Sequence, residues 1–187
     1  MFLSVTVRRA LRLAVALSLT ALAAPTGAHA QGCANIHVAP TRANLQAVRA
    51  AVLCLHNAER ARHRLPPLRE NPRLRRAAER HASHMVGARF FDHTDPAGAT
   101  MLDRLRRTGY TSGAHAWSVG ENIAWGSGRL ATAAEVHRSW MRSPGHRANI
   151  LRRSFREVGI GVETGVPVRL SASQTGATYA TDFGFRR

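Results

Sequence analysis

The order of the periodic segments along the chain constrains its fold more than any other feature. Apolar side chains recur at spacings of three and four in the first two thirds, which predicts amphipathic helices, and strand-like alternation comes in the last third. The predicted helices cover residues 45–63, run from Asn71-Pro72 to Gly87, and follow capping boxes at Thr100–Asp103 and Thr132–Glu135. The predicted strands are 158–162, 166–170 and 179–185. This order predicts an α+β domain with helices covering an antiparallel sheet.

The first 30 residues have the layout of a secretory signal peptide. Three arginines precede an apolar stretch, Leu13–Ala24, and then Ala28-His29-Ala30, which is an Ala-x-Ala cleavage site. The apolar stretch is short for a membrane span, and an uncleaved anchor is the alternative. We therefore predict a cleaved signal at 1–30, an N-terminal segment at 31–43 and one domain at 44–187. The mature protein is expected to be secreted or periplasmic, with no transmembrane anchor.

All the basic side chains other than histidine are arginines, and they give the 187-residue chain a net charge of +16. Removal of the signal lowers this charge to about +13. The arginines are scattered through helix-like segments, which is typical of a solvated basic surface. Nucleic-acid binding is not expected, because no aromatic strand platform or recognition helix accompanies the charge. Attraction to anionic lipid head groups or cell-wall polymers fits an exported protein better.

Two cysteines, Cys33 and Cys54, follow the predicted signal. An even pair in an oxidising compartment predicts a disulfide, which here would tie the N-terminal segment to the first helix. A lipid-anchored Cys33 is the alternative, but the residues before it fit a lipoprotein cleavage box poorly. Anchoring would also leave Cys54 unpaired, so the disulfide is preferred.

Three residues stand out as candidates for chemistry. His93 follows an aromatic pair in a predicted loop, His146 lies in a predicted corner after a helix, and Glu121 heads an apolar stretch. A partly desolvated carboxylate is costly unless paired, and two imidazoles would pair it. The three groups suit zinc or a similar divalent metal, or general acid–base work. Their spacing matches no local metal motif.

The other histidines and the tryptophans have simpler interpretations. His56, His63 and His137 are expected to be exposed on helices, among charged neighbours. His81 falls on the apolar face of its helix, so it is expected to be a hydrogen-bonded core histidine that could support a site. The tryptophans at 125 and 140 are expected to be in the core.

Six motifs in order resemble bacterial members of the CAP superfamily, which contains the cysteine-rich secretory proteins, antigen 5 and pathogenesis-related proteins of class 1. The motifs are Cys54–Arg60, Phe91–His93, Gly120–Gly126, Trp140–Leu151, Val158–Gly161 and Tyr179–Gly184. The resemblance covers about Asn44 to Phe185. It implies a three-layer α-β-α sandwich with a central antiparallel sheet and a cleft that holds two histidines and two acids. In many members the histidines bind a divalent metal, often zinc.

The resemblance carries over to His93, His146 and Glu121, whereas Ser143 stands where animal and plant members place the second acid. A metal would then be held more weakly, or with water. Asn57 and Arg60 also match family positions, and we expect them to lock the first helix to the domain. The supporting residues predicted around the site are Asn57, Arg60, His81, Asn122 and Ser143.

The resemblance implies varied functions without one shared reaction. The first hypothesis is a non-enzymatic exported module that binds a lipid, a sterol or an anionic envelope component. The second is a metal-assisted hydrolase acting on peptides or cell-wall material, with Glu121 as base or third ligand. If Glu121 binds metal, no obvious base remains, so the binding module is favoured. No nucleotide or organic cofactor is expected.

Overall fold

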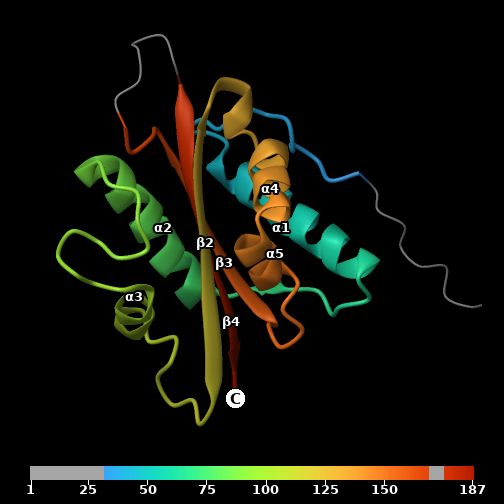
Figure 1. Ribbon diagram of the computed structural model, residues 1–187, viewed down its shortest axis with the longest axis vertical. Helices are drawn as coiled ribbons and strands as arrows, with labels where there is room; N and C mark the ends of the chain where they lie inside the picture. The colour runs from blue at the N-terminus through green and yellow to red at the C-terminus, as the bar shows by residue number, and fades with distance from the viewer. Residues whose placement is uncertain (1–31, 169–174) are drawn as a thin grey trace, which may run out of the picture. The chain divides into compact units, whose positions relative to one another are not determined.

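The computed structural model describes residues 32–168 and 175–187, and the predicted signal peptide lies outside this range. Five α-helices, one 3-10 helix and four strands follow one another along the described chain (Figure 1). They are α1 (Leu45–Arg62), β1 (Arg69–Glu70), α2 (Pro72–Ala88), α3 (Met101–Arg107), β2 (Trp117–Ser127), η1 (Gly128–Ala131), α4 (Ala133–Arg142), α5 (Pro144–Ile150), β3 (Glu157–Thr164) and β4 (Gly176–Arg186).

The four strands form one sheet in the order β1-β3-β4-β2. The pairs β3–β4 and β4–β2 are antiparallel, and the two-residue β1 runs parallel to β3. Helices α2 and α3 lie on one face of the sheet, and α1, α4 and α5 lie on the other (Figure 1). The α+β class and the three-layer α-β-α arrangement are therefore confirmed. Strand β2 is an edge strand, with α5 beside it.

Helix α2 lies against the sheet because two glycines of β3 leave room for it. A Cβ atom at Gly159 would collide with the backbone of Leu74 and Arg75, and one at Gly161 would collide with the backbone of Ala78. The start of α2 also follows the sequence prediction, since the Asn71 side chain accepts hydrogen bonds from the first backbone N–H groups of the helix. The predicted capping box at Thr100 is formed as well.

Several local predictions were wrong. Strand β2 was not predicted, because Gly120-Glu121-Asn122 at its centre breaks the apolar alternation of a strand. The corner after α4 is the helix α5. Thr132 does begin α4, but its hydroxyl donates to the Arg129 carbonyl instead of capping the helix.

The ends of two other segments also differ from the prediction. Helix α2 runs past Gly87 and stops at Arg89, which adopts the left-handed conformation (φ 56°). Of the predicted strand 166–170, residues 166–168 are not in a strand and 169–170 lie outside the described residues. The core expectation holds for Trp140, which is 1% exposed, but fails for Trp125, which is 38% exposed on the edge strand.

His56 and His137 are buried between α1 and α4, which corrects the expectation that they are exposed. Their Nδ1 atoms are 3.0 Å apart, so one imidazole donates a hydrogen bond to the other. The His56 ring stacks on Phe183 and lies against Trp140. Of the three histidines expected to be exposed on helices, His63 at the end of α1 is the one that is exposed. Burial lowers the pKa of His137 to about 4 and also lowers the pKa of His56.

Arg60 and Asn57 fasten α1 to the rest of the domain. The fully buried Arg60 guanidinium donates to the backbone carbonyls of Pro66, Ile150, Arg152 and Phe155 at 2.8–3.1 Å. The Asn57 side chain exchanges two hydrogen bonds with the backbone of Leu68. These contacts are the helix-locking role expected from the sequence, and they lie on the face of the sheet opposite to α2 and α3.

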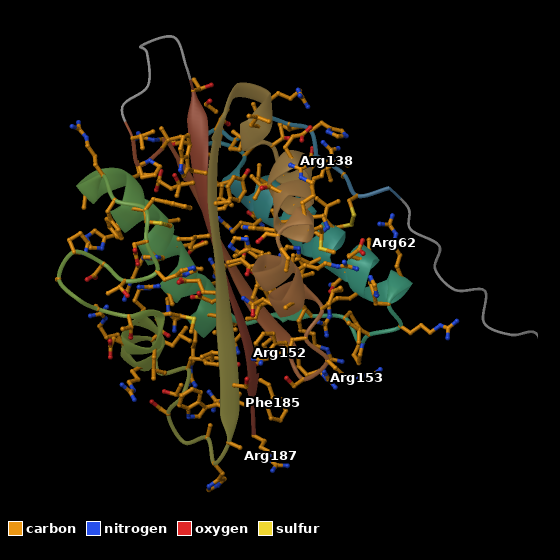
Figure 2. The ribbon with its side chains drawn as sticks, in the orientation of Figure 1. Arg62, Arg138, Arg152, Arg153, Phe185 and Arg187 are labelled. Carbon is orange, nitrogen blue, oxygen red and sulfur yellow. A yellow bond between two sulfur atoms is a disulfide. The ribbon has the colours of Figure 1, made fainter. Side chains whose placement is uncertain are left out.

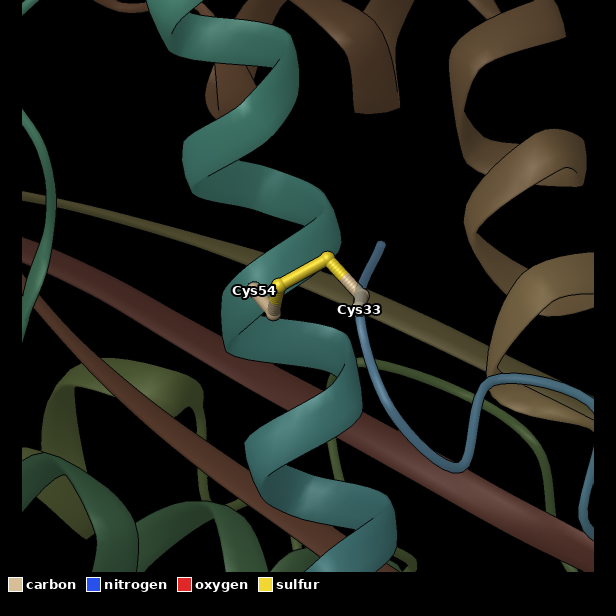
Figure 3. The surroundings of a disulfide bond; sticks show 2 residues. All are labelled: Cys33 and Cys54. Atoms are coloured by element: carbon tan, nitrogen blue, oxygen red, sulfur yellow. A yellow bond between two sulfur atoms is a disulfide. The ribbon is translucent and has the colours of Figure 1, made fainter. Parts of the chain in front are cut away.

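The predicted disulfide between Cys33 and Cys54 is formed (Figure 3). It joins the segment before α1 to the middle of that helix, and the two Cα atoms are 5.7 Å apart. Neither cysteine is free to serve as a nucleophile or a lipid anchor while the bond is intact.

Candidate functional site

The candidate site is built around Glu121, in the middle of the edge strand β2. Glu121 lies opposite Asp182 in the β2–β4 ladder, and its side chain points toward α2 and α3. Only 7% of the residue is exposed. A carboxylate buried to this extent needs charged or hydrogen-bonding partners.

Arg104 of α3 is the principal partner of Glu121. Its Nη2 atom lies 2.7 Å from one carboxylate oxygen of Glu121 and 3.0 Å from the other. Its Nη1 atom donates to the carbonyl of His93 at 2.9 Å, which holds the loop before α3 against the sheet. Arg104 carries no special signal in the sequence, because it is one of many arginines in helical segments. A carboxylate predicted to be desolvated could have prompted a search for such a cation.

His93 reaches Glu121 from the loop between α2 and α3. Its Nδ1 atom donates to Glu121 Oε1 at 2.8 Å, which fixes the tautomer and leaves Nε2 facing away from the carboxylate. The His93 side chain is 52% exposed, whereas the Glu121 side chain is 2% exposed. The hydrogen bond to Glu121 raises the pKa of His93. Burial alone would raise the pKa of Glu121, but the His93 hydrogen bond and the Arg104 charge outweigh it and hold that pKa below its ordinary value.

Two further titratable groups lie beneath this arrangement. His81 of α2 donates from Nε2 to the Asp92 carbonyl at 3.0 Å, and the same atom is 3.9 Å from Glu121. It is the buried, hydrogen-bonded histidine expected from the sequence. Asp182 is fully buried, and neither carboxylate oxygen has a hydrogen-bond partner among the described residues. Burial and the adjacent Glu121 carboxylate raise the pKa of Asp182 well above its ordinary value, which favours its protonated form.

His146 comes to the site from the other face of the sheet, in the first turn of α5. Asn122, which follows Glu121 in β2, donates from Nδ2 to the His146 carbonyl at 3.0 Å. Asn149 donates to both the Glu121 carbonyl and the Asn122 side chain, so two asparagines fasten α5 to β2. Burial, followed by the charge of His93, lowers the pKa of His146. His93 and His146 therefore flank the same stretch of the edge strand.

The predicted residues are thus brought together in two parts. His93, Glu121 and His81 form one hydrogen-bonded or closely spaced group, and His146 approaches that group through Asn122. Ser143 is the residue before α5, and its side chain makes no capping hydrogen bond. Within residues 32–168 and 175–187, no group of three histidine, cysteine or acidic side chains is placed to hold a metal ion. The same part of the chain has no helix both long and apolar enough to cross a membrane.

The sequence and the fold both match a known family. A profile of the cysteine-rich secretory protein family (CAP) matches residues 53–168. The match covers more than half of the chain, so the protein belongs to the CAP family.

Individual relatives support the assignment. The protein YkwD of Bacillus subtilis is 36% identical over 115 residues, which are 61% of this chain and 42% of YkwD. An extracellular protein of Bacillus anthracis that contains an SCP domain is 28% identical, with a TM-score of 0.58 over 75% of this chain and 40% of that structure. The chain thus spans less than half of either relative. An outer surface protein of Borrelia burgdorferi (TM-score 0.58, 18% identity, 79% and 96% coverage) shares the fold.

Proposed function

We propose that this protein is an exported binding domain whose site at His93 and His146 takes a divalent cation. The observation that carries the proposal is the hydrogen bond from His93 Nδ1 to Glu121, at 2.8 Å. A histidine that ligates a metal through one ring nitrogen commonly donates from the other to a carboxylate. Export is supported by the disulfide and by the extracellular relative from Bacillus anthracis.

The donor set fits a two-histidine site. His93 offers Nε2, and the His146 ring makes no hydrogen bond within the described part of the chain. The lowered pKa of His146 favours the neutral imidazole, which is the form that ligates a metal. Two imidazoles are half of the four ligands that zinc takes, so water or a bound partner would complete the set. A bound cation would supply a Lewis-acidic point for an anionic or carbonyl oxygen of a partner.

In this proposal Glu121 orients His93 and does not ligate the metal. Both of its oxygens already accept hydrogen bonds from Arg104, and one also accepts from His93. The same contacts and the lowered pKa make Glu121 a poor general base. This is why binding is proposed rather than the metal-assisted hydrolysis that remains the alternative.

An anionic envelope component suits the candidate site better than a lipid or a sterol. The cavity that adjoins His81 and Arg104 has a volume of about 90 Å³ and is also lined by Arg80, Asp95 and Arg107. Pockets for apolar ligands are typically about 300–1,000 Å³ and mostly apolar.

Calorimetric titration of the mature protein with zinc tests the proposal. The wild type should bind zinc, and the His93→Ala/His146→Ala double variant should not. A matched His37→Ala/His115→Ala variant, which removes two exposed histidines elsewhere, should bind as the wild type does. Binding should also weaken as the pH falls, because protonation of His93 blocks Nε2. Zinc binding that is unchanged in the site variant would refute the metal assignment.

The role of Glu121 has its own readout in the same titration. Loss of a carboxylate that only orients a ligating histidine typically weakens metal binding by about 10–100-fold. Glu121→Gln should therefore bind zinc measurably but more weakly. If the wild type turned over peptide or cell-wall substrates and the His93→Ala/His146→Ala variant did not, the hydrolase would replace the binding domain as the proposed function.

A further inference from the structure

A second hollow lies at the end of the sheet where β4 ends. Its volume is about 440 Å³, and its lining includes Arg69 of β1, Arg156 just before β3, and Arg186 at the end of β4. Phe185 and the Pro66-Pro67 pair supply apolar lining. None of these residues belongs to the candidate site. We call this hollow the Arg69 groove.

The positive charge of the Arg69 groove is not neutralised within the described residues. None of its three arginines has a carboxylate within ion-pair distance among residues 32–168 and 175–187. The guanidinium groups of Arg156 and Arg186 donate only to backbone carbonyls, which carry no net charge. One acid, Glu157, lies in the lining, and its two oxygens already accept hydrogen bonds from Asn71 and Tyr110, both at 2.7 Å.

A comparable hollow elsewhere in the molecule has the opposite character. It has a volume of about 430 Å³, and Arg49 and Arg75 line it. Arg49 pairs with Glu79 at 3.3 Å, and Arg75 pairs with both Glu79 and Glu70 at 3.2–3.3 Å. A hollow of similar volume in this chain therefore has its arginines neutralised by acids. The arginines of the Arg69 groove differ from Arg49 and Arg75 in having no carboxylate partner among the described residues.

We propose that the Arg69 groove binds an anionic polymer of the cell envelope whose charges are phosphodiester groups. Guanidinium groups donate two parallel hydrogen bonds to phosphate oxygens, and the groove offers guanidinium groups from three separate parts of the chain. This arrangement suits successive phosphates along a chain better than one isolated anion. Phe185 and the two prolines offer apolar contact to the carbon atoms between the phosphates.

The surroundings of the groove support a polymer over a membrane surface. Arg152, Arg153 and Arg187 lie toward the same end of the molecule as Phe185, so positive charge continues beyond the hollow (Figure 2). Of the large apolar side chains that are exposed, Trp117 lies beside the lining, opposite Arg186 in the β2–β4 ladder, whereas Val38, Phe91, Trp125 and Leu130 are not part of the lining. One aromatic side chain beside the groove is a small apolar surface for insertion into a bilayer. The inference rests on the proposed export of the protein but not on the proposed metal site.

Binding of poly(glycerol phosphate) to the mature protein, followed by calorimetry at low and physiological salt, tests the inference. Loss of two exposed charge contacts in Arg69→Gln/Arg156→Gln should weaken binding about tenfold. The Arg49→Gln/Arg75→Gln variant removes the same charge from the paired hollow and should change the affinity less than about twofold. Arg69→Gln alone gives a second check on folding, since the Arg69 side chain makes no hydrogen bond or ion pair with the described residues. The affinity of every variant should fall as salt is raised.

Four results would overturn the inference. An equal loss in both double variants would show general electrostatic attraction, and an absence of polymer binding would leave no role for the groove. Phosphatidylglycerol vesicles that bind as tightly as the polymer, with the same dependence on Arg69 and Arg156, would assign the groove to a lipid surface. Single-stranded DNA that does so would assign it to nucleic acid. Zinc titration of the same samples separates the two proposals, because polymer binding should persist in His93→Ala/His146→Ala.

Discussion

Acidification should destabilise the protein through the histidine pair that is buried between α1 and α4. His137 is 9% exposed, and burial lowers its pKa from 6.5 to about 4 in the folded protein. In the unfolded chain the same imidazole has a pKa of about 6.5. Between these values the unfolded chain binds more protons than the folded one, so the free energy of unfolding must fall as the pH falls from about 6.5 to about 4.

The size of this effect follows from the difference between the two pKa values. His137 alone should cost about 2 kcal/mol of stability at pH 5 and about 3 kcal/mol at pH 4, relative to pH 8. His56 adds to the loss in the same direction, because burial lowers its pKa as well. The charge of a first proton would also oppose a second one on the neighbouring ring, 3.0 Å away.

Urea unfolding at pH 7.5, 6, 5 and 4.5 measures the effect. His137→Gln keeps a polar side chain that does not titrate, so its stability should fall between pH 7.5 and 5 by about 2 kcal/mol less than that of the wild type. His115→Gln changes an exposed histidine and should keep the wild-type slope. Parallel curves for the wild type and His137→Gln over this range would refute the assignment of the acid loss to the buried pair.

Two further predictions concern the attachments of α1. Arg60→Ala removes the donor to four backbone carbonyl groups, two of them in buried hydrogen bonds and two in part-buried ones, and should lower the free energy of unfolding by about 4 kcal/mol. Arg60→Lys should recover only part of this stability, because one ammonium group cannot reach all four carbonyls. Equal stability of Arg60→Ala and the wild type in urea would contradict the role of the guanidinium. Replacing Cys33 and Cys54 by serine removes a disulfide between residues 21 positions apart and should lower the free energy of unfolding by about 3 kcal/mol. A melting temperature that is unchanged by this double substitution would contradict the prediction.

The sequence predicted the helices better than the sheet. The periodic apolar positions of α1 and α2 and the Asn71 cap are local signals, and they survive in the folded protein. Strand β2 was missed because its central residues are polar. These polar residues can be buried only because Arg104, Asn149 and the His93 loop supply hydrogen-bond partners from distant parts of the chain. Such partners are tertiary contacts that no local pattern contains.

The candidate site shows the same division. His93, Glu121 and His146 were selected from loop position, desolvation and family resemblance, and the structure places them around one edge strand. His146, however, is linked to Glu121 only indirectly. Its backbone carbonyl accepts a hydrogen bond from the side chain of Asn122, the residue that follows Glu121 in β2. The buried histidines at 56 and 137 were missed because a helical face with charged neighbours looks exposed when the packing of α1 on α4 is not known.

The close approach of α2 to β3 makes the candidate site sensitive to mutations that never touch it. Gly159 pairs with Asp182, which pairs with Glu121, so the glycine lies two strands away from the carboxylate. Any side chain there would push α2 outward and carry His81 away from the sheet. In a mutational screen scored on ligand binding, substitutions at 159 and 161 would therefore be scored among the loss-of-function positions. A map of contacts to the ligand would omit both, because what these positions contribute is a missing side chain.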